Sequence, residues 1–126
     1  MDLLLDTHVF IWWNADDARL AAAAREAIDD PENRILGSAA SVREISIKRK
    51  SGKLTFRHNI LDALAQDGVA MLDITPMHAD VAGSLPLHHA DPFDRLLVAQ
   101  AKIEGFVLVT QDRQLLPYGI PLLGMT

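Results

Sequence analysis

The sequence predicts an α/β/α sandwich with a mainly parallel central sheet, formed by a single domain over residues 1–126. Short apolar runs, each suited to a buried strand, alternate along the chain with segments of helical periodicity. Such alternation requires crossover connections, which give parallel strand pairing with helices on both faces of the sheet. The 126 residues fit one compact domain, and 49% of them are hydrophobic against 23% charged, which favours a globular chain.

Residues 2–74 carry three of the predicted strands. Residues 2–6 form an apolar run that is too short for a helix and ends in Asp6. Apolar residues at helical spacing predict a helix over 17–29, which Pro31 follows. A strand over 34–37 and a helix over 38–50 come next, with Gly52 just beyond as a helix stop. Residues 58–67 and 69–74 then read as a helix and another buried strand.

Prolines mark two helix starts in the second half. Pro76 is expected to open one helix. In the stretch from Asp91 to Asp94, an N-cap acid precedes Pro92 at the first helical position, and this helix should run to about Glu104. An apolar run over 107–110 predicts a strand, and residues 120–123 a last short one.

Composition excludes several classes of protein. The chain has no cysteine, so it can form neither a disulfide framework nor a cysteine-based zinc site. It has no apolar run long enough to span a membrane, and an acid stands at position 2 where a signal peptide needs basic residues, so we expect a soluble, cytoplasmic protein without membrane contact. A net charge of −5 argues against a broad basic face for nucleic acid.

Basic residues are nevertheless concentrated in one region. Within 43–57, six of the twelve basic residues of the chain accompany a single acid, Glu44. This run either attracts an anionic partner or simply forms a solvated surface, and the sequence leaves both readings open. The six residues are Arg43, Lys48, Arg49, Lys50, Lys53 and Arg57.

Four acids stand where a parallel sheet could bring them together. Asp6 closes the first strand, Asp112 follows the 107–110 strand, and Asp94 lies in the first turn of a helix. Glu44 lies inside a helix on the side of Ala40 and Ile47, a poor position for a purely solvating acid. Because ligands bind beyond the carboxyl ends of parallel strands, these acids could form a site for Mg²⁺ or Mn²⁺. Such an ion promotes phosphodiester hydrolysis.

The same four acids could instead have structural roles. Asp6 and Asp112 could cap the turns after their strands, Asp94 could complement a helix dipole, and Glu44 could pair with Lys48. Asp91 is better explained as an N-cap than as a metal ligand. We also treat three histidines as structural or as phosphate contacts, Thr7 as an orienting group, and two tryptophans as core, interface or base-stacking residues. These residues are His8, His88, His89, Trp12 and Trp13.

The motifs together resemble a PIN-domain toxin of the VapC family. The resemblance covers nearly the whole chain, from Leu3-Leu4-Leu5-Asp6-Thr7-His8 through the helix around Glu44 to Thr110-Gln111-Asp112, and the block from His88 to Ala101 is its most specific part. It implies a PIN fold, Mg²⁺- or Mn²⁺-dependent cleavage of RNA, a homodimer and inhibition by a VapB-type protein antitoxin. The family's acidic positions fall on Asp6, Glu44, Asp94 and Asp112, with Asp6 and Asp94 as direct metal ligands. Ala90 and Leu115-Leu116 depart from the commonest pattern, which weakens any inference about how the substrate is gripped.

Two other classes of function compete with the nuclease. A receiver-type signalling domain would need an acid pair after the first strand and a lysine after the last, whereas Thr7 and His8 follow Asp6 and no lysine follows Lys102. A non-catalytic interaction domain would have no need of all four acids. Within the enzyme class, the residues do not separate a ribonuclease from a DNA nuclease that uses the same carboxylates.

Overall fold

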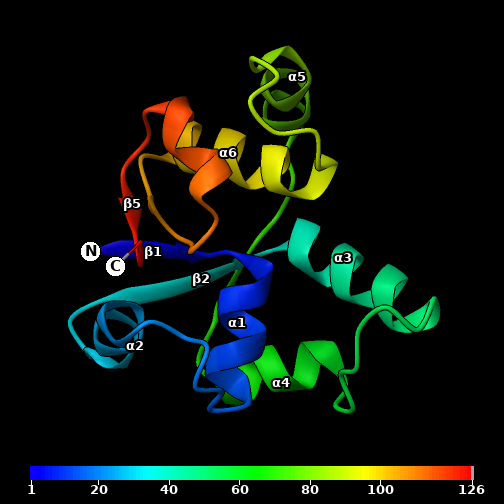
Figure 1. Cartoon of the computed structure of the whole chain (residues 1–126), viewed down its shortest axis with the longest axis vertical. Coiled ribbons are helices and arrows are strands. Elements are labelled where there is room, and N and C mark those ends of the chain that lie inside the picture. Colours follow the sequence, from blue (N-terminus) through cyan, green and yellow to red (C-terminus); the bar gives the residue numbers. More distant parts are fainter. Residues whose placement is uncertain (126) are drawn as a thin grey trace.

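The computed structural model describes residues 1–125, which alternate between strands and helices as the sequence predicts. The first half contains β1 (Asp2–Leu5), α1 (Thr7–Asn14), α2 (Ala22–Asp29), β2 (Arg34–Ser38), α3 (Ala39–Lys50) and α4 (Ile60–Gln66). The second half contains β3 (Ala70–Leu72), α5 (Pro76–Ser84), α6 (Pro92–Glu104), β4 (Val107–Val109), the 3-10 helix η1 (Arg113–Tyr118) and β5 (Leu122–Leu123). Figure 1 shows these elements coloured from blue to red along the chain and labels most of them.

The five strands form one sheet in the order β3-β2-β1-β4-β5, and every neighbouring pair is parallel. β1 lies in the centre, where Leu4 pairs with Leu36 of β2 and with Leu108 of β4. From β1 the chain builds outward through β2 to β3, then returns to the other side of β1 for β4. The direction of winding therefore reverses between β1 and β4, and in open α/β sheets such a reversal marks the usual ligand crevice.

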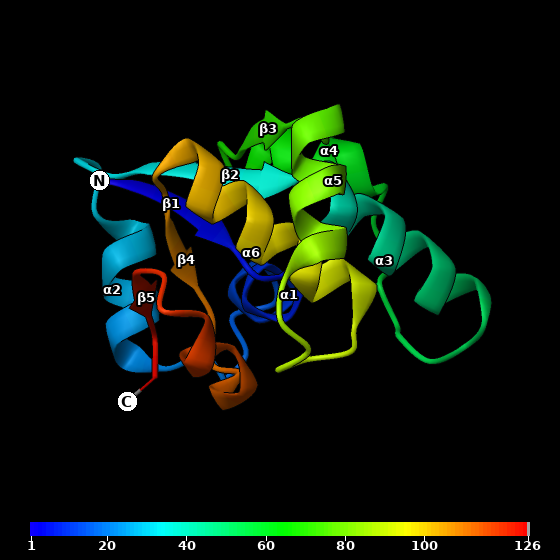
Figure 2. The ribbon, with the colours of Figure 1, turned by 90° about the horizontal axis from the view of Figure 1, so that it is seen from above.

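Helices cover both faces of the sheet, which confirms the predicted sandwich (Figures 1 and 2). Side chains alternate along a strand, so Leu3 and Leu5 pack with α1, α2 and α4, while Leu4 packs under α6 on the opposite face. α5 lies against α6. α3 extends past the carboxyl ends of β1 and β2 and closes that end of the sheet (Figure 2).

Three local features differ from the prediction. Residues 7–14 form α1, for which no helix was predicted, because a segment rich in aromatic and β-branched residues shows no polar face and has low helix propensity. The predicted helix over 17–29 begins only at Ala22, since the Asp17 side chain accepts a hydrogen bond from the Arg19 backbone and favours a turn. The strand predicted to be buried over 69–74 is the edge strand β3, with Ala70 and Met71 exposed.

No helix of residues 1–125 combines the length and apolar character that crossing a membrane requires.

Candidate active site

Asp6 and Asp112 flank the point where the winding of the sheet reverses. Asp6 follows β1 directly, and its backbone N–H donates to the Val109 carbonyl of β4 at 2.9 Å. The Thr110 hydroxyl, at the end of β4, donates to Asp6 Oδ2 at 2.7 Å and accepts from the Asp112 backbone N–H at 3.1 Å. Thr110 therefore links the two acids across neighbouring strands and fixes one carboxylate oxygen of Asp6.

Helices α3 and α6 supply the other two acids. Ser38 caps α3 by accepting from the Ala40 N–H, and Glu44 follows on the buried side of this helix. Asp91 caps α6 by accepting from the backbone N–H groups of Phe93 and Asp94, at 2.8 and 3.2 Å, which confirms the N-cap prediction. The cap fixes the first turn of α6 and thereby the place of Asp94.

The structure brings all four predicted acids together around one cavity of about 490 Å³. Volumes of several hundred Å³ are usual for sites that bind small ligands. The cavity is lined by Asp6, Glu44, Asp94 and Asp112, and also by His8, Val9, Trp12, Lys48, His89, Asp91, Gln111 and Gln114. His88 and Trp13 are not among these residues.

Burial and mutual repulsion perturb the acids. Burial, reinforced by the charges of Asp6, Asp91 and Glu44, raises the pKa of Asp94 from its ordinary 3.8 to about 7. Burial also raises the pKa of Asp6, although the hydrogen bond from Thr110 opposes the shift. Carboxylates that repel one another in a partly dry cavity favour a cation between them.

The residues present fit a divalent cation. Asp6 and Glu44 are only 5% and 2% exposed, yet Asp6 Oδ1 and Glu44 Oε1 have no hydrogen-bond partner. Buried carboxylate oxygens are rarely left without a partner, because desolvation without a compensating bond is costly. Hard divalent ions prefer oxygen ligands, so each of these unpartnered oxygens is suited to such an ion.

The capping and ion-pairing roles considered for these acids are compatible with their position in the cavity. Asp112 accepts from the Gln114 N–H through Oδ1, which leaves Oδ2 for other contacts. Glu44 pairs with Lys48 at 2.5 Å through Oε2, which leaves Oε1 unpartnered. Asp6 makes no side-chain cap for α1. Each cap or pair uses one oxygen, so these roles do not exclude a metal site.

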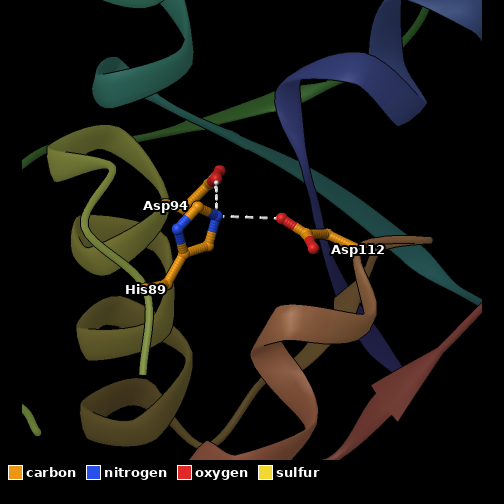
Figure 3. Close-up of side chains that lie close together, drawn as sticks. All are labelled: His89, Asp94 and Asp112. Atoms are coloured by element: carbon orange, nitrogen blue, oxygen red, sulfur yellow. Dashed lines mark hydrogen bonds and ion pairs between the residues drawn. The ribbon is translucent and has the colours of Figure 1, made fainter. Parts of the chain in front are cut away.

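His89 lies in the site, although only a structural or phosphate-contacting role was expected for it. Its Nε2 is 2.9 Å from Asp94 Oδ2 and 2.9 Å from Asp112 Oδ2, so one ring nitrogen bridges acids from α6 and from the end of β4 (Figure 3). These three side chains offer ligand atoms within 4.8 Å of one another. The sequence held no signal for this bridge, because His89 lies in a loop and its neighbours in space are distant in the chain.

A buried arginine holds the loop that carries His89. Arg95 on α6 is 9% exposed, and its guanidinium donates five hydrogen bonds, all to neutral oxygens. The acceptors are the carbonyls of Ala82, Leu85, Pro86 and His89 and the hydroxyl of Tyr118. The Tyr118 hydroxyl also accepts from the His89 N–H and donates to Pro86. Arg95 and Tyr118 thus bind the loop at several points beside the cavity.

Replacing Arg95 with Met is expected to destabilise the protein by about 3 kcal/mol, because one buried and several part-buried oxygen acceptors lose their donor at once. Urea denaturation measures the change in the free energy of unfolding. Arg113→Met is the matched control: Arg113 is exposed, and its loss should change stability by less than about 0.5 kcal/mol. Equal effects of the two substitutions would show that the Arg95 hydrogen bonds contribute little.

The strand order also bears on the receiver-type alternative. Receiver domains have the order 2-1-3-4-5, whereas this sheet has the order 3-2-1-4-5. In this sheet β4 rather than β3 lies next to β1. The topology therefore counts against a receiver domain.

Comparisons with known proteins agree with the fold. The family model of the PIN domain matches residues 3–119. Ribonuclease VapC22 of Mycobacterium tuberculosis (strain ATCC 25618 / H37Rv) is 36% identical over 116 residues, which cover 90% of this chain and 88% of that protein.

Solved structures of toxin–antitoxin proteins share the architecture. A chain of VapBC2 from Rickettsia felis, solved bound to a DNA fragment from its promoter, aligns with a TM-score of 0.70 at 15% identity and covers 97% of both chains. A chain of VapBC-1 from nontypeable Haemophilus influenzae aligns with a TM-score of 0.65 at 19% identity, covering 97% of this chain and 96% of that one. At these identities the alignments establish a common fold.

Proposed function

This chain belongs to the PIN-domain family and, within it, to the VapC group, and we propose that it is a metal-dependent endoribonuclease acting as the toxin of a toxin–antitoxin pair. The observation that carries the proposal is the convergence of four carboxylates on one cavity, two of them with buried, unpartnered oxygens. The relative from Mycobacterium tuberculosis is named as a ribonuclease, which supports RNA as the substrate.

The metal site of this proposal consists of Asp6, Glu44, Asp94 and Asp112, with Asp6 and Asp94 as the direct ligands of Mg²⁺ or Mn²⁺. A bound divalent ion would polarise the scissile phosphodiester and lower the pKa of the attacking water. Thr110 orients Asp6 through its hydrogen bond. His89 fixes the carboxylates of Asp94 and Asp112 relative to each other, and Lys48 balances part of the negative charge of Glu44.

Cleavage of RNA by the purified protein tests the proposal directly. Fluorescently labelled single-stranded RNA should be cut in Mg²⁺ or Mn²⁺ and left intact in EDTA, and adding the ion in excess of EDTA should restore cleavage. Single-stranded DNA of the same sequence, assayed in parallel, separates a ribonuclease from a DNA nuclease. Undiminished RNA cleavage in EDTA would refute the metal dependence.

The partners of this proposal are an RNA substrate, a VapB-type protein antitoxin and a second copy of the chain. VapBC complexes among the similar structures support the antitoxin, and the cytoplasm is the compartment in which these partners would meet. Exposed apolar side chains on β3, in the loop after it and at the start of α5 support self-association, which light scattering in solution would test. These side chains are Met71, Ile74 and Met77.

Part of the basic run is free to contact RNA phosphates or an antitoxin. Arg49 donates to the carbonyls of Phe56 and His58, so it has a structural role. Lys50, Lys53 and Arg57 are exposed, and no ion pair of theirs is found within residues 1–125.

Replacing Lys50, Lys53 and Arg57 together with Gln should therefore weaken RNA binding and flatten its salt dependence. The expected change in the slope of log K against log salt is about 0.7 per lost phosphate contact with single-stranded RNA. Fluorescence anisotropy at several salt concentrations measures both quantities. Lys102→Gln, a surface charge at the far end of α6, is the control. Unchanged RNA affinity, salt slope and antitoxin binding would leave the run as a solvated surface.

A further inference from the structure

An aromatic wall borders the acidic cavity on the side of α1. His8 and Trp12, one helical turn apart, both line the cavity that holds Asp6, Asp94 and Asp112. His8 is exposed and Trp12 partly exposed. Their rings lie with centroids 5.9 Å apart and planes tilted by 49°. Two aromatic rings thus adjoin the carboxylates.

A cation is fixed over the indole of this wall. The Arg19 guanidinium carbon lies 5.3 Å from the centroid of Trp12. Asp17 holds Arg19 in place, because its carboxylate accepts from Arg19 Nε at 3.1 Å and from Nη2 at 2.8 Å. The Asp17 backbone N–H in turn donates to the Trp12 carbonyl at 2.8 Å. Arg19 therefore keeps its position although its side chain is 70% exposed.

Hydrogen bonds also connect the Arg19 segment to the end of β4, close to Asp112. Gln111 immediately precedes Asp112, and its side chain accepts from the Ala21 N–H at 2.7 Å and donates to the Arg19 carbonyl at 3.0 Å. This clamp joins the Arg19 segment to the residues at the end of β4 that lead to Asp112. A ligand that contacts both would meet a preformed surface, which lowers the cost of ordering on binding.

The neighbouring tryptophan has a different role. Trp13 does not line the cavity, and its indole N–H donates to Asp29 at 3.0 Å. Both tryptophans pack partly against the core, so packing alone does not distinguish them. Only Trp12 combines ring surface in the cavity with an overlying cation.

We propose that His8, Trp12 and Arg19 form a stacking site for an unpaired base of RNA next to the phosphate held at the acidic cavity. The inference rests on the proposed ribonuclease function and specifies its substrate: a single-stranded segment whose base leaves its own stack. Every base has a π-face, so an aromatic ring with an arginine beside it binds single strands with little sequence preference.

Single-tryptophan proteins test the contact directly. Trp13→Phe leaves Trp12 as the only tryptophan, and Trp12→Phe leaves Trp13. Both are made in an Asp94→Asn background to prevent cleavage and titrated with hexauridylate in Mg²⁺. Quenching of indole fluorescence is expected for the protein that retains Trp12 and not for the one that retains Trp13. RNA binding without a response from Trp12 overturns the inference and leaves the proposed function standing.

Abasic substrates separate stacking from a structural role of Trp12. In the same Asp94→Asn background, Trp12→Leu should bind hexauridylate roughly tenfold more weakly than protein with Trp12 intact, and Trp12→Phe should retain most of the affinity. A hexamer with the stacked base removed should bind the Trp12 and Trp12→Leu proteins equally.

Equal losses with both hexamers mean that Trp12 only supports the fold and overturn the inference. Unchanged hexauridylate binding by the Leu variant also overturns the inference. In that case the aromatic wall would be a contact surface for a protein partner. Should the Leu variant lose the native circular dichroism spectrum, the Phe variant and the quenching titrations decide. A protein that neither binds nor cleaves RNA refutes this inference and the proposed function together.

Discussion

Asp94→Asn and Asp6→Asn are each expected to reduce RNA cleavage at least ~100-fold, because each removes the charge of a proposed direct metal ligand. Both side chains line the acidic cavity, and Asn keeps their size and one acceptor oxygen. The loss should therefore come from weaker ion binding rather than from altered packing. Initial rates of cleavage of a labelled RNA, measured over a range of Mn²⁺ concentrations, give both the residual rate and the ion requirement.

The control is Asp80→Asn on α5, an exposed acid outside the cavity, which should cleave RNA at the wild-type rate. If the two site variants lose activity through the metal, part of the lost rate should return at high Mn²⁺ concentration. Wild-type rates in either site variant would refute the assignment of that residue as a ligand.

The architecture could be predicted from the sequence because the central strands are nearly uniform apolar runs. Leu3, Leu4 and Leu5 face both helical layers, so all three must be apolar, and the pattern is visible without the structure. Helix α6 was equally readable, since Asp91, Pro92 and Gly105 mark its two ends. α1 escaped prediction because its apolar residues are spread around most of the helix, and the 3-10 helix η1 carries no periodic signal of its own.

The acids that follow β1 and β4 could be predicted as site residues from the sequence. Parallel strands place their carboxyl ends on one edge of the sheet, so these acids are neighbours in space. Glu44 could also be predicted, because an acid on the buried side of a helix is costly unless a partner or a ligand compensates it. His89 could not be selected in this way. Its place depends on the Arg95 and Tyr118 hydrogen bonds, which join the 85–91 loop to α6 and to η1, and nothing in the local sequence predicts such bonds.

The metal-free protein should become more stable when Asp94 is replaced by Asn, whereas its stabilisation by Mg²⁺ should decrease. Asp94 lies near Asp6, Asp91 and Glu44 in a partly buried setting, and these charges together with burial raise its pKa to about 7. Removing one of several like charges should relieve repulsion on the order of 1 kcal/mol or more. For a domain of this size that corresponds to a rise of about 4 °C in Tm.

The gain should depend on pH in a defined direction. Because the folded-state pKa of Asp94 lies above its ordinary 3.8, the folded protein binds this proton more tightly than the unfolded chain does. The charged form therefore costs stability as pH rises from about 4 to about 7. Below about pH 4 Asp94 is protonated in both the folded and the unfolded state and resembles Asn, so the variant should gain little. At pH 8 the full gain should be present.

Thermal melts in EDTA and in excess Mg²⁺ measure both effects. An ion that binds only the folded state at 100 times its Kd stabilises it by about 2.7 kcal/mol, so weaker binding reduces the stabilisation of the variant. If Asp94 merely complemented the dipole of α6, the Asn variant would instead be less stable in EDTA by about 0.3–1 kcal/mol and would respond to Mg²⁺ as the wild type does. The two hypotheses predict opposite signs, so the melts distinguish them. A residue that only complements the helix dipole cannot both destabilise the metal-free protein and strengthen its stabilisation by the ion.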